Sequence, residues 1–217
     1  ISASPELFLR RRGRRLETRP IKGSARRLPD SAADRRQVEA LRADIKNAAE
    51  HTMVVDLARN DLGRVCRFGS VSVEAHAAVE SFPAVHHLVS TVTGEARPGV
   101  ELLQLLEATF PAASITGAPK VRVMEAIAQY EASPRGIYTG TIGRLGANGN
   151  LDLNVAIRTI VARRLPGDVF EYEFGAGGAV VADSDPESEY EECLLKAEPL
   201  LQAILTAEAL DLCRAGD

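Results

Sequence analysis

The stretch from Phe174 to Lys196, FGAGGAVVADSDPESEYEECLLK, decides how the fold is interpreted. It predicts a strand that leads into a glycine loop and then into a strongly acidic helix. Ser184 or Asp185 can cap that helix, and Pro186 suits its first turn. Glu187 would complete a Ser-x-x-Glu capping box with Ser184. The last strand and the last helix of the chain therefore meet within these residues.

The same stretch carries groups that can bind ligands. Backbone amides exposed by glycines can hold a carboxylate or a phosphate, and the glycines here are Gly175, Gly177 and Gly178. Helical spacing puts Glu189 and Glu192 on one face, with Lys196 one turn further on. Two carboxylates three residues apart can hold a hard cation. From spacing alone, an acidic surface helix after a turn is the favoured explanation of these residues.

Bulk properties exclude several classes of protein. The chain has 217 residues, 45% of them hydrophobic and 26% charged, which suits one large globular domain or part of one. A formal net charge of −4 gives no reason to expect a nucleic-acid or membrane partner. Cys66, Cys193 and Cys213 are widely spaced, without a CxxC motif, so neither a disulfide framework nor a zinc site is indicated.

No stretch is apolar for long enough to span a bilayer, and no signal peptide is visible, so we expect a cytoplasmic protein. The first residues, from Ile1 to Glu6, read like the middle of a sheet. We therefore expect an N-terminal portion to be missing. The basic run from Arg10 to Arg15 crosses a turn and lacks interleaved aromatic residues, which favours a solvated hairpin tip over a nucleic-acid site.

Periodicity and turn residues predict the remaining elements. A hairpin is expected within 6–21. Further strands are expected at 69–73, 84–92, 137–145, 151–164 and 169–174. Helices are expected at 30–60, 100–109, 120–130 and 187–214. Long helices packed on antiparallel sheet layers make the expected fold class α+β.

Several motifs together resemble the chorismate-utilising enzymes, which include anthranilate, aminodeoxychorismate, isochorismate and salicylate synthases. The motifs are SPELF at 4–8, TRPIKGS at 18–24, AEHTMVVDLARNDLGRV at 49–65, FPAASITGAPKVRVMEAI at 110–127, PRGIYTGTIG at 134–143 and AGGAVVADSDPESEYEE at 176–192. The match covers nearly the whole chain in order. It corresponds to the C-terminal portion of longer proteins, so residues 1–217 would form part of a chorismate-binding catalytic domain.

The resemblance implies Mg²⁺ as cofactor. The ion would bind the ring carboxylate of chorismate and make that end of the substrate an electron sink. Glu50 and Glu192 are the implied direct ligands, with Glu189 as a further or water-mediated one. Mg²⁺ prefers such hard oxygen ligands. Three carboxylates without a metal would repel one another strongly, which is a further reason to expect the cation.

The second carboxylate of chorismate is implied to bind Arg158, whose planar fork suits a carboxylate. The remaining implied substrate contacts are Tyr138, the amides of Gly177 and Gly178, and the loop residues Thr116 and Gly117. Lys196 is also implied to belong to the substrate-binding residues, and it would balance charge near the metal-binding helix.

Three residues match catalytic positions in the resembled family. Glu6 corresponds to a general acid, which must be protonated near neutral pH, and burial or neighbouring carboxylates would raise its pKa. Lys22 corresponds to a nucleophile that attacks the substrate ring and forms a covalent adduct. His87 is implied to orient groups or handle a proton. We expect His86 to be structural.

The motif Pro20-Ile21-Lys22-Gly23 resembles that of aminodeoxychorismate synthases rather than anthranilate synthases. It implies amination of chorismate to 4-amino-4-deoxychorismate, with ammonia from a glutamine amidotransferase subunit. Anthranilate synthase component I stays open as an alternative. A non-catalytic module that binds chorismate or another subunit is an alternative of a different class.

Overall fold

The structure is a computed structural model of the chain. It describes residues 1–167, 169–182 and 184–215, and for 208–215 it describes the backbone only. The chain divides into a larger unit, residues 5–134 and 141–155, and a smaller unit, residues 1–4, 135–140 and 156–217. Among the described residues, no helix has the length and apolar character needed to cross a membrane.

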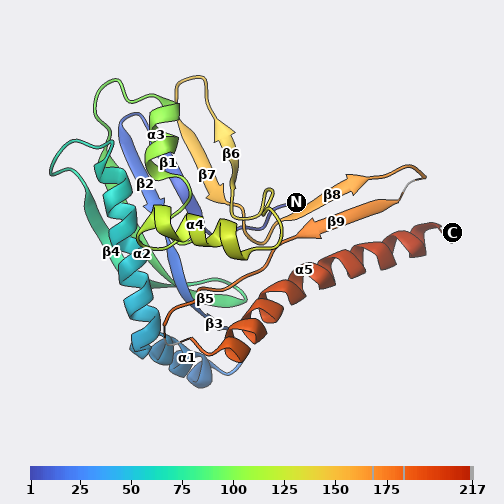
Figure 1. Ribbon diagram of the computed structural model, residues 1–217. Helices are drawn as coiled ribbons and strands as arrows, with labels where there is room; N and C mark the ends of the chain where they lie inside the picture. The colour runs from blue at the N-terminus through green and yellow to red at the C-terminus, as the bar shows by residue number, and fades with distance from the viewer. Residues whose placement is uncertain (168, 183, 216–217) are drawn as a thin grey trace. The chain divides into compact units, whose positions relative to one another are not determined.

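The larger unit is built on an antiparallel sheet, whose described strands run in the order β3-β5-β2-β1-β7-β6, with β4 also paired to β5 (Figure 1). The strands are β1 (Leu7–Arg12), β2 (Arg15–Arg19), β3 (Ile21–Arg26), β4 (Ser72–Ser81), β5 (Val85–Glu95), β6 (Thr141–Leu145) and β7 (Leu151–Val155). The predicted hairpin is confirmed as β1 and β2. The strand expected at 69–73 starts later and runs on to Ser81 as β4.

β5 holds the sheet together because it pairs with three strands. β2 and β3 bond to successive parts of β5, with Thr18 opposite Val92 and Ile21 opposite Val89. β4 pairs with β5 along almost its whole length. Most residues of β5 are buried, which is expected for a strand covered on both faces.

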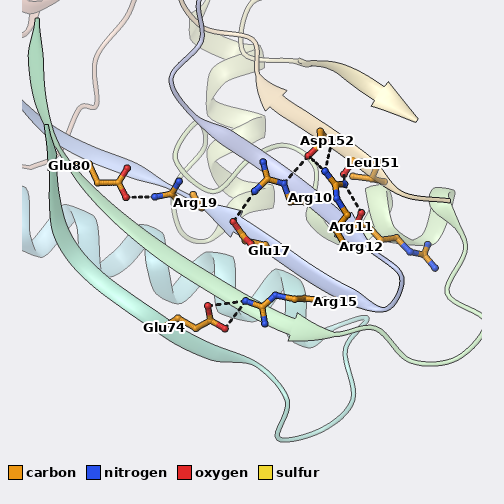
Figure 2. A network of polar contacts seen from close by, with 10 residues as sticks. All are labelled: Arg10, Arg11, Arg12, Arg15, Glu17, Arg19, Glu74, Glu80, Leu151 and Asp152. Atoms are coloured by element: carbon orange, nitrogen blue, oxygen red, sulfur yellow. Dashed lines mark hydrogen bonds and ion pairs between the residues drawn. The ribbon is translucent and has the colours of Figure 1, made fainter. Parts of the chain in front are cut away.

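The basic run at the hairpin is paired with acids on the same sheet (Figure 2). Arg10 and Arg12 donate to Asp152 of β7, at 2.8 and 2.7 Å. Hydrogen bonds from these guanidinium groups hold the pKa of the Asp152 carboxyl well below its usual range. Arg15 likewise binds Glu74 of β4. Arg10 and Arg12 therefore join β1 to β7 and Arg15 joins β2 to β4, so their charges are balanced within the sheet.

Two helices, α1 (Ser31–Ala43) and α2 (Ile45–Gly63), replace the single helix expected at 30–60. The break falls at Asp44, whose carboxylate accepts a hydrogen bond from the Asn47 N–H at 2.9 Å and so caps α2. The single-helix prediction was wrong because Asp44 fits the apolar repeat as an exposed residue of a continuous helix, so the sequence pattern does not reveal that it caps α2. α2 packs against β3 and β5.

Two shorter helices follow, α3 (Leu102–Thr109) and α4 (Lys120–Tyr130), close to their predicted bounds. α3 packs against α2. Residues 110–119 connect the two helices, and below we call this connection the small-residue loop.

The smaller unit contains the hairpin of β8 (Ile160–Arg164) and β9 (Phe170–Phe174) and the helix α5 (Pro186–Ala215). The strand expected at 151–164 was wrong as one element. It is divided into β7 and β8 around Arg158, whose φ of +50° is incompatible with a continuous strand. The strand expected at 137–145 begins only at Thr141. Asp168 lies outside the described residues.

The start of α5 confirms one of the two predicted caps, Asp185, but not the predicted capping box. The Ser188 N–H donates to Asp185 Oδ1 at 3.0 Å, so Asp185 is the cap. Ser184 does not form the expected box with Glu187, because its hydroxyl donates to Glu189 Oε1 at 2.6 Å. Antiparallel sheets with long helices confirm the predicted α+β class.

Candidate active site

In the larger unit, three of the expected catalytic and metal-binding residues lie near one another. Lys22 Nζ, from β3, lies 3.5 Å from Glu50 Oε2, from α2, and both side chains are largely buried (19% and 11% exposed). The charge of Lys22 also acts on the carboxyl of Glu6, which directly precedes β1. The hydroxyl of Ser114 donates to Glu6 Oε1 at 2.5 Å. We call Glu6, Lys22, Glu50 and Ser114 the lysine cluster.

Glu6 has the electrostatics of a proton donor. Its side chain is buried, and this burial raises its pKa from 4.5 to about 7. Hydrogen bonds from Ser114 and from the backbone of Ile21, together with the positive charge of Lys22, oppose the rise in pKa. A carboxyl group that titrates near neutral pH can both hold a proton and release it in a reaction at that pH.

The two adjacent histidines make different contacts. His86 lies between Asp34 and Ser81, with Nε2 at 3.0 Å from Asp34 Oδ1 and Nδ1 at 2.8 Å from Ser81 Oγ. These contacts tie α1 to the β4–β5 hairpin. His87 Nδ1 lies 2.6 Å from Ser24 Oγ in β3, and its ring packs on Phe82. The expected role of His87 in catalysis stays a prediction.

The small-residue loop carries Thr116 and Gly117, two expected substrate contacts. Thr116 Oγ1 donates to the Ala112 carbonyl at 3.4 Å, and Gly117 has a φ of +128°, which favours glycine. Ser114, on the same loop, was not among the residues singled out from the sequence. A hydroxyl in a loop of small residues gives no sign of a carboxyl that lies 108 positions away.

In the smaller unit, the ring of Tyr138 covers the glycine loop. A Cβ at Gly175 would lie 2.2 Å from Tyr138 Cγ, and one at Gly177 would lie 2.9 Å from Tyr138 Oη. Both positions therefore require glycine, because a side chain would displace the ring. Arg135 lies over the Tyr138 ring, 6.0 Å from its centroid.

Lys196 joins α5 to the glycine loop. Its Nζ donates to the Gly177 carbonyl at 3.0 Å and pairs with the Glu192 carboxylate. The Arg158 guanidinium donates to the Lys196 carbonyl at 3.0 Å. These contacts give Lys196 a positioning role within the unit. We call this group the glycine-loop cluster, made up of Tyr138, Arg158, Gly175, Gly177, Gly178, Glu189, Glu192 and Lys196.

Two of the expected metal ligands flank the same small space. A Cβ at Gly178 would lie 3.2 Å from Glu189 Oε2 and 3.7 Å from Glu192 Oε1. The absence of a side chain there leaves both carboxylates facing one backbone position, and their oxygens are the type that Mg²⁺ prefers. Within each unit taken alone, the described residues contain no group of three His, Cys, Asp or Glu side chains suited to a metal ion. Glu50, the third expected ligand, belongs to the larger unit.

Known proteins are similar to this chain in sequence and in fold. The family model for chorismate binding enzymes matches residues 1–202 of this chain. Anthranilate synthase component 1 of Aquifex aeolicus (strain VF5) is 48% identical over 208 residues, which are 96% of this chain and 41% of that protein. Aminodeoxychorismate synthase component 1 of Escherichia coli (strain K12) is 46% identical over 204 residues, 94% of this chain and 44% of that protein.

The crystal structure of anthranilate synthase component I from Streptococcus pneumoniae TIGR4 superposes with a TM-score of 0.78 at 38% identity, covering 92% of this chain and 43% of that one. The chain thus spans about two fifths of the length of the curated relatives above. The family model, the sequence identities and the shared fold agree, and they confirm the resemblance noted from the motifs. The chain belongs to the family of chorismate binding enzymes.

Proposed function

We propose that the protein containing this chain aminates chorismate to 4-amino-4-deoxychorismate and that Lys22 forms a covalent intermediate with the substrate. The observation that carries the proposal is the lysine cluster. A largely buried amine lies beside the Glu50 carboxylate and acts on Glu6, a buried carboxyl whose pKa is about 7. A nucleophile and a proton donor are the two groups that this displacement needs.

The proposed reaction has two displacement steps. The neutral amine of Lys22 attacks the ring carbon beside the carboxyl-bearing carbon, electrons shift through the diene, and the allylic hydroxyl leaves as water with a proton from Glu6. Ammonia then adds at the other allylic position and expels Lys22, whose nitrogen recovers its electron pair. Lys22 must give its proton to a base before the attack, and the Glu50 carboxylate lies 3.5 Å from its Nζ.

We assign Mg²⁺ as the cofactor. The proposed ligands are Glu189 and Glu192, which flank the space beside Gly178, and Glu50, as the family resemblance implies. When bound to the ring carboxylate, the ion would supply an electron sink for the displacement.

The substrate contacts in the proposal are those that the family resemblance implies. Arg158 and Tyr138, with the amides of Gly177 and Gly178, would bind the second carboxylate of chorismate. Lys196 would hold the glycine loop in place. Thr116 and Gly117 would contact the substrate, and His87 would orient groups or handle a proton.

We also propose that ammonia comes from a glutamine amidotransferase subunit. The relatives compared above are each named as component 1, which supports a second component in their enzymes. The second candidate function is anthranilate synthesis, and it is favoured by the 48% identity to the anthranilate synthase component of Aquifex aeolicus.

One product assay separates these functions. The protein, as its gene encodes it, is incubated with chorismate, Mg²⁺ and an ammonium salt. Formation of 4-aminobenzoate only after addition of aminodeoxychorismate lyase supports the proposal. Fluorescent anthranilate without any lyase would establish the second candidate, and no product in either case would favour a non-catalytic module.

The covalent step has its own test. Lys22→Ala should abolish most product formation with ammonium salts, whereas Lys46→Ala, at an exposed lysine of α2, should not. Undiminished 4-amino-4-deoxychorismate formation by Lys22→Ala would remove the covalent step from the proposal.

A further inference from the structure

The contact between Ser114 and Glu6 assigns a role to a residue outside the expected catalytic set. We infer that Ser114 is a positioning residue that fixes the carboxyl group of Glu6 for proton donation in the proposed reaction. The inference rests on the proposed function for its catalytic part. Its structural part rests on a hydrogen bond of 2.5 Å from Ser114 Oγ to Glu6 Oε1.

Glu6 is held at both ends. Its backbone carbonyl accepts a hydrogen bond from the Val155 N–H at 3.1 Å, which fixes the main chain beside β7. Its side chain is 5% exposed and is fixed through Oε1 by Ser114. A protonated carboxyl oxygen is the weaker acceptor of the two, so a hydroxyl that donates to Oε1 favours the acid proton on Oε2. The Ile21 backbone N–H also donates to this carboxyl group, so Ser114 is one of two described hydrogen-bond donors that fix it.

Ser114 is itself held by a rigid connection. A turn surrounds it, in which the Ile115 N–H donates to the Ala112 carbonyl at 3.0 Å. Lys120, the first residue of α4, donates to the carbonyls of Thr109 and Pro111 at 3.1 and 2.7 Å. These bonds fix the start of the small-residue loop, so the serine hydroxyl is placed by the protein frame rather than by solvent.

The electrostatic consequence of the contact has a definite sign. The described charged group that acts on Glu6 is Lys22 of β3, whose Nζ in turn lies beside the Glu50 carboxylate of α2. Burial raises the pKa of Glu6, and the hydrogen bond from Ser114 is the largest of the effects that lower it. Loss of the hydroxyl would leave the burial in place, and the pKa of Glu6 would rise above about 7.

The test compares Ser114→Ala with Ser114→Thr, which keeps the hydroxyl, and with Ser133→Ala at an exposed serine. The pKa of Glu6 is measured by NMR in the free protein without Mg²⁺, using glutamate labelled with ¹³C at the carboxyl and Glu6→Gln for assignment. Ser114→Ala should raise this pKa by roughly one unit. Ser114→Thr and Ser133→Ala should leave it near that of the parent protein. An unchanged pKa in Ser114→Ala would overturn the inference whatever the activity.

Turnover supplies the second readout. With the proposed assay, Ser114→Ala should lower kcat about 100-fold with little change in KM, because the proton donor is misplaced by a fraction of an ångström. The basic limb of its pH profile should move upward with the pKa of Glu6, and Ser114→Thr should restore both. Unchanged turnover and pH profile in Ser114→Ala would overturn the positioning role. If the parent protein makes no product although the pKa still moves, the proposed function and the catalytic role both fail, while the Ser114–Glu6 contact stands.

Discussion

Lys120 Nζ lies 2.7 Å from Asp61 Oδ2, so the first residue of α4 is bonded to the last turn of α2. Asp61 is buried, and burial raises the pKa of its carboxyl while Lys120 opposes the rise. The same ammonium group also donates to the Thr109 and Pro111 carbonyls. One lysine thus joins two helices to the loop that carries Ser114.

Removal of this lysine should be costly. Lys120→Met would leave Asp61 buried without its cation, and the expected loss in the free energy of unfolding is about 3–5 kcal/mol. Urea denaturation at pH 7 measures the loss, and Lys46→Met, at an exposed lysine, serves as the control. The double variant Asp61→Leu/Lys120→Met should recover much of the stability, since it leaves no unpaired charge. A loss below about 1 kcal/mol in Lys120→Met would contradict the buried pairing.

Glu6 should make the stability of the protein depend on pH in a direction opposite to most carboxyls. Its pKa is about 7 in the folded protein against 4.5 as the ordinary value, so folding favours the protonated form. The contribution of Glu6 to the free energy of unfolding is therefore fully present below pH 4.5. It is lost as the pH rises through about 7, and the loss amounts to at most about 3 kcal/mol. In urea denaturation curves measured between pH 4 and 8, Glu6→Gln should remove this decline, because glutamine does not titrate. A decline that persists in Glu6→Gln would have to come from another group.

Much of the fold could be predicted from periodicity, and the failures have local causes. The single helix expected at 30–60 divides because Asp44 caps the second helix, and a one-residue break leaves the apolar repeat almost unchanged. The strand expected at 151–164 divides because Arg158 adopts a left-handed conformation that no local pattern announces. In both cases the tertiary structure stabilises a backbone conformation that the local sequence leaves undecided.

The space beside Gly178 predicts an effect on metal binding. Gly178→Ala would place a methyl group 3.2 Å from Glu189 Oε2, so the Glu189 carboxylate would have to shift relative to Glu192. We expect Mg²⁺ to bind about tenfold more weakly, as measured by isothermal titration calorimetry. Gly63→Ala is the matched control, since its Cβ would meet nothing within 4 Å. An unchanged Mg²⁺ affinity would argue against Glu189 and Glu192 as ligands.

The arginine contacts of Asp152, of which Figure 2 draws two, predict that Asp152 stabilises the fold more than Asp56 does. Asp152 accepts hydrogen bonds from Arg10, Arg12 and Arg144, so Asp152→Asn should lower the free energy of unfolding by about 1–3 kcal/mol. Asp56 forms a single exposed pair with Arg59, and Asp56→Asn should change stability little. Thermal denaturation of both variants gives the comparison. Equal effects would mean that the three arginines gain nothing from sharing one carboxylate.

The candidate site was predictable to the extent that its residues sit in recognisable motifs. Glu6, Lys22 and Glu50 could be named because each lies in a distinctive stretch, and within one unit Lys22 lies beside Glu50 and acts on Glu6. Ser114 could not be named, because its partner is distant in sequence and a serine between small residues is common in loops. Contacts of this kind depend on the packed loop rather than on any local pattern.

The central position of β5 has a consequence for synthesis on the ribosome. β2 and β3 lie some 60–80 positions upstream of it, and their open hydrogen-bonding groups find their partner only in residues 85–95. The first strand also bonds to Leu151–Val155. Until β5 has emerged from the ribosome, the backbone groups at these strand edges therefore stay unpaired. Chains with unpaired strand edges tend to aggregate and to be bound by chaperones. A pause in translation between the codons for Arg26 and Val85 should for this reason harm the yield of folded protein more than a pause after the codon for Val155.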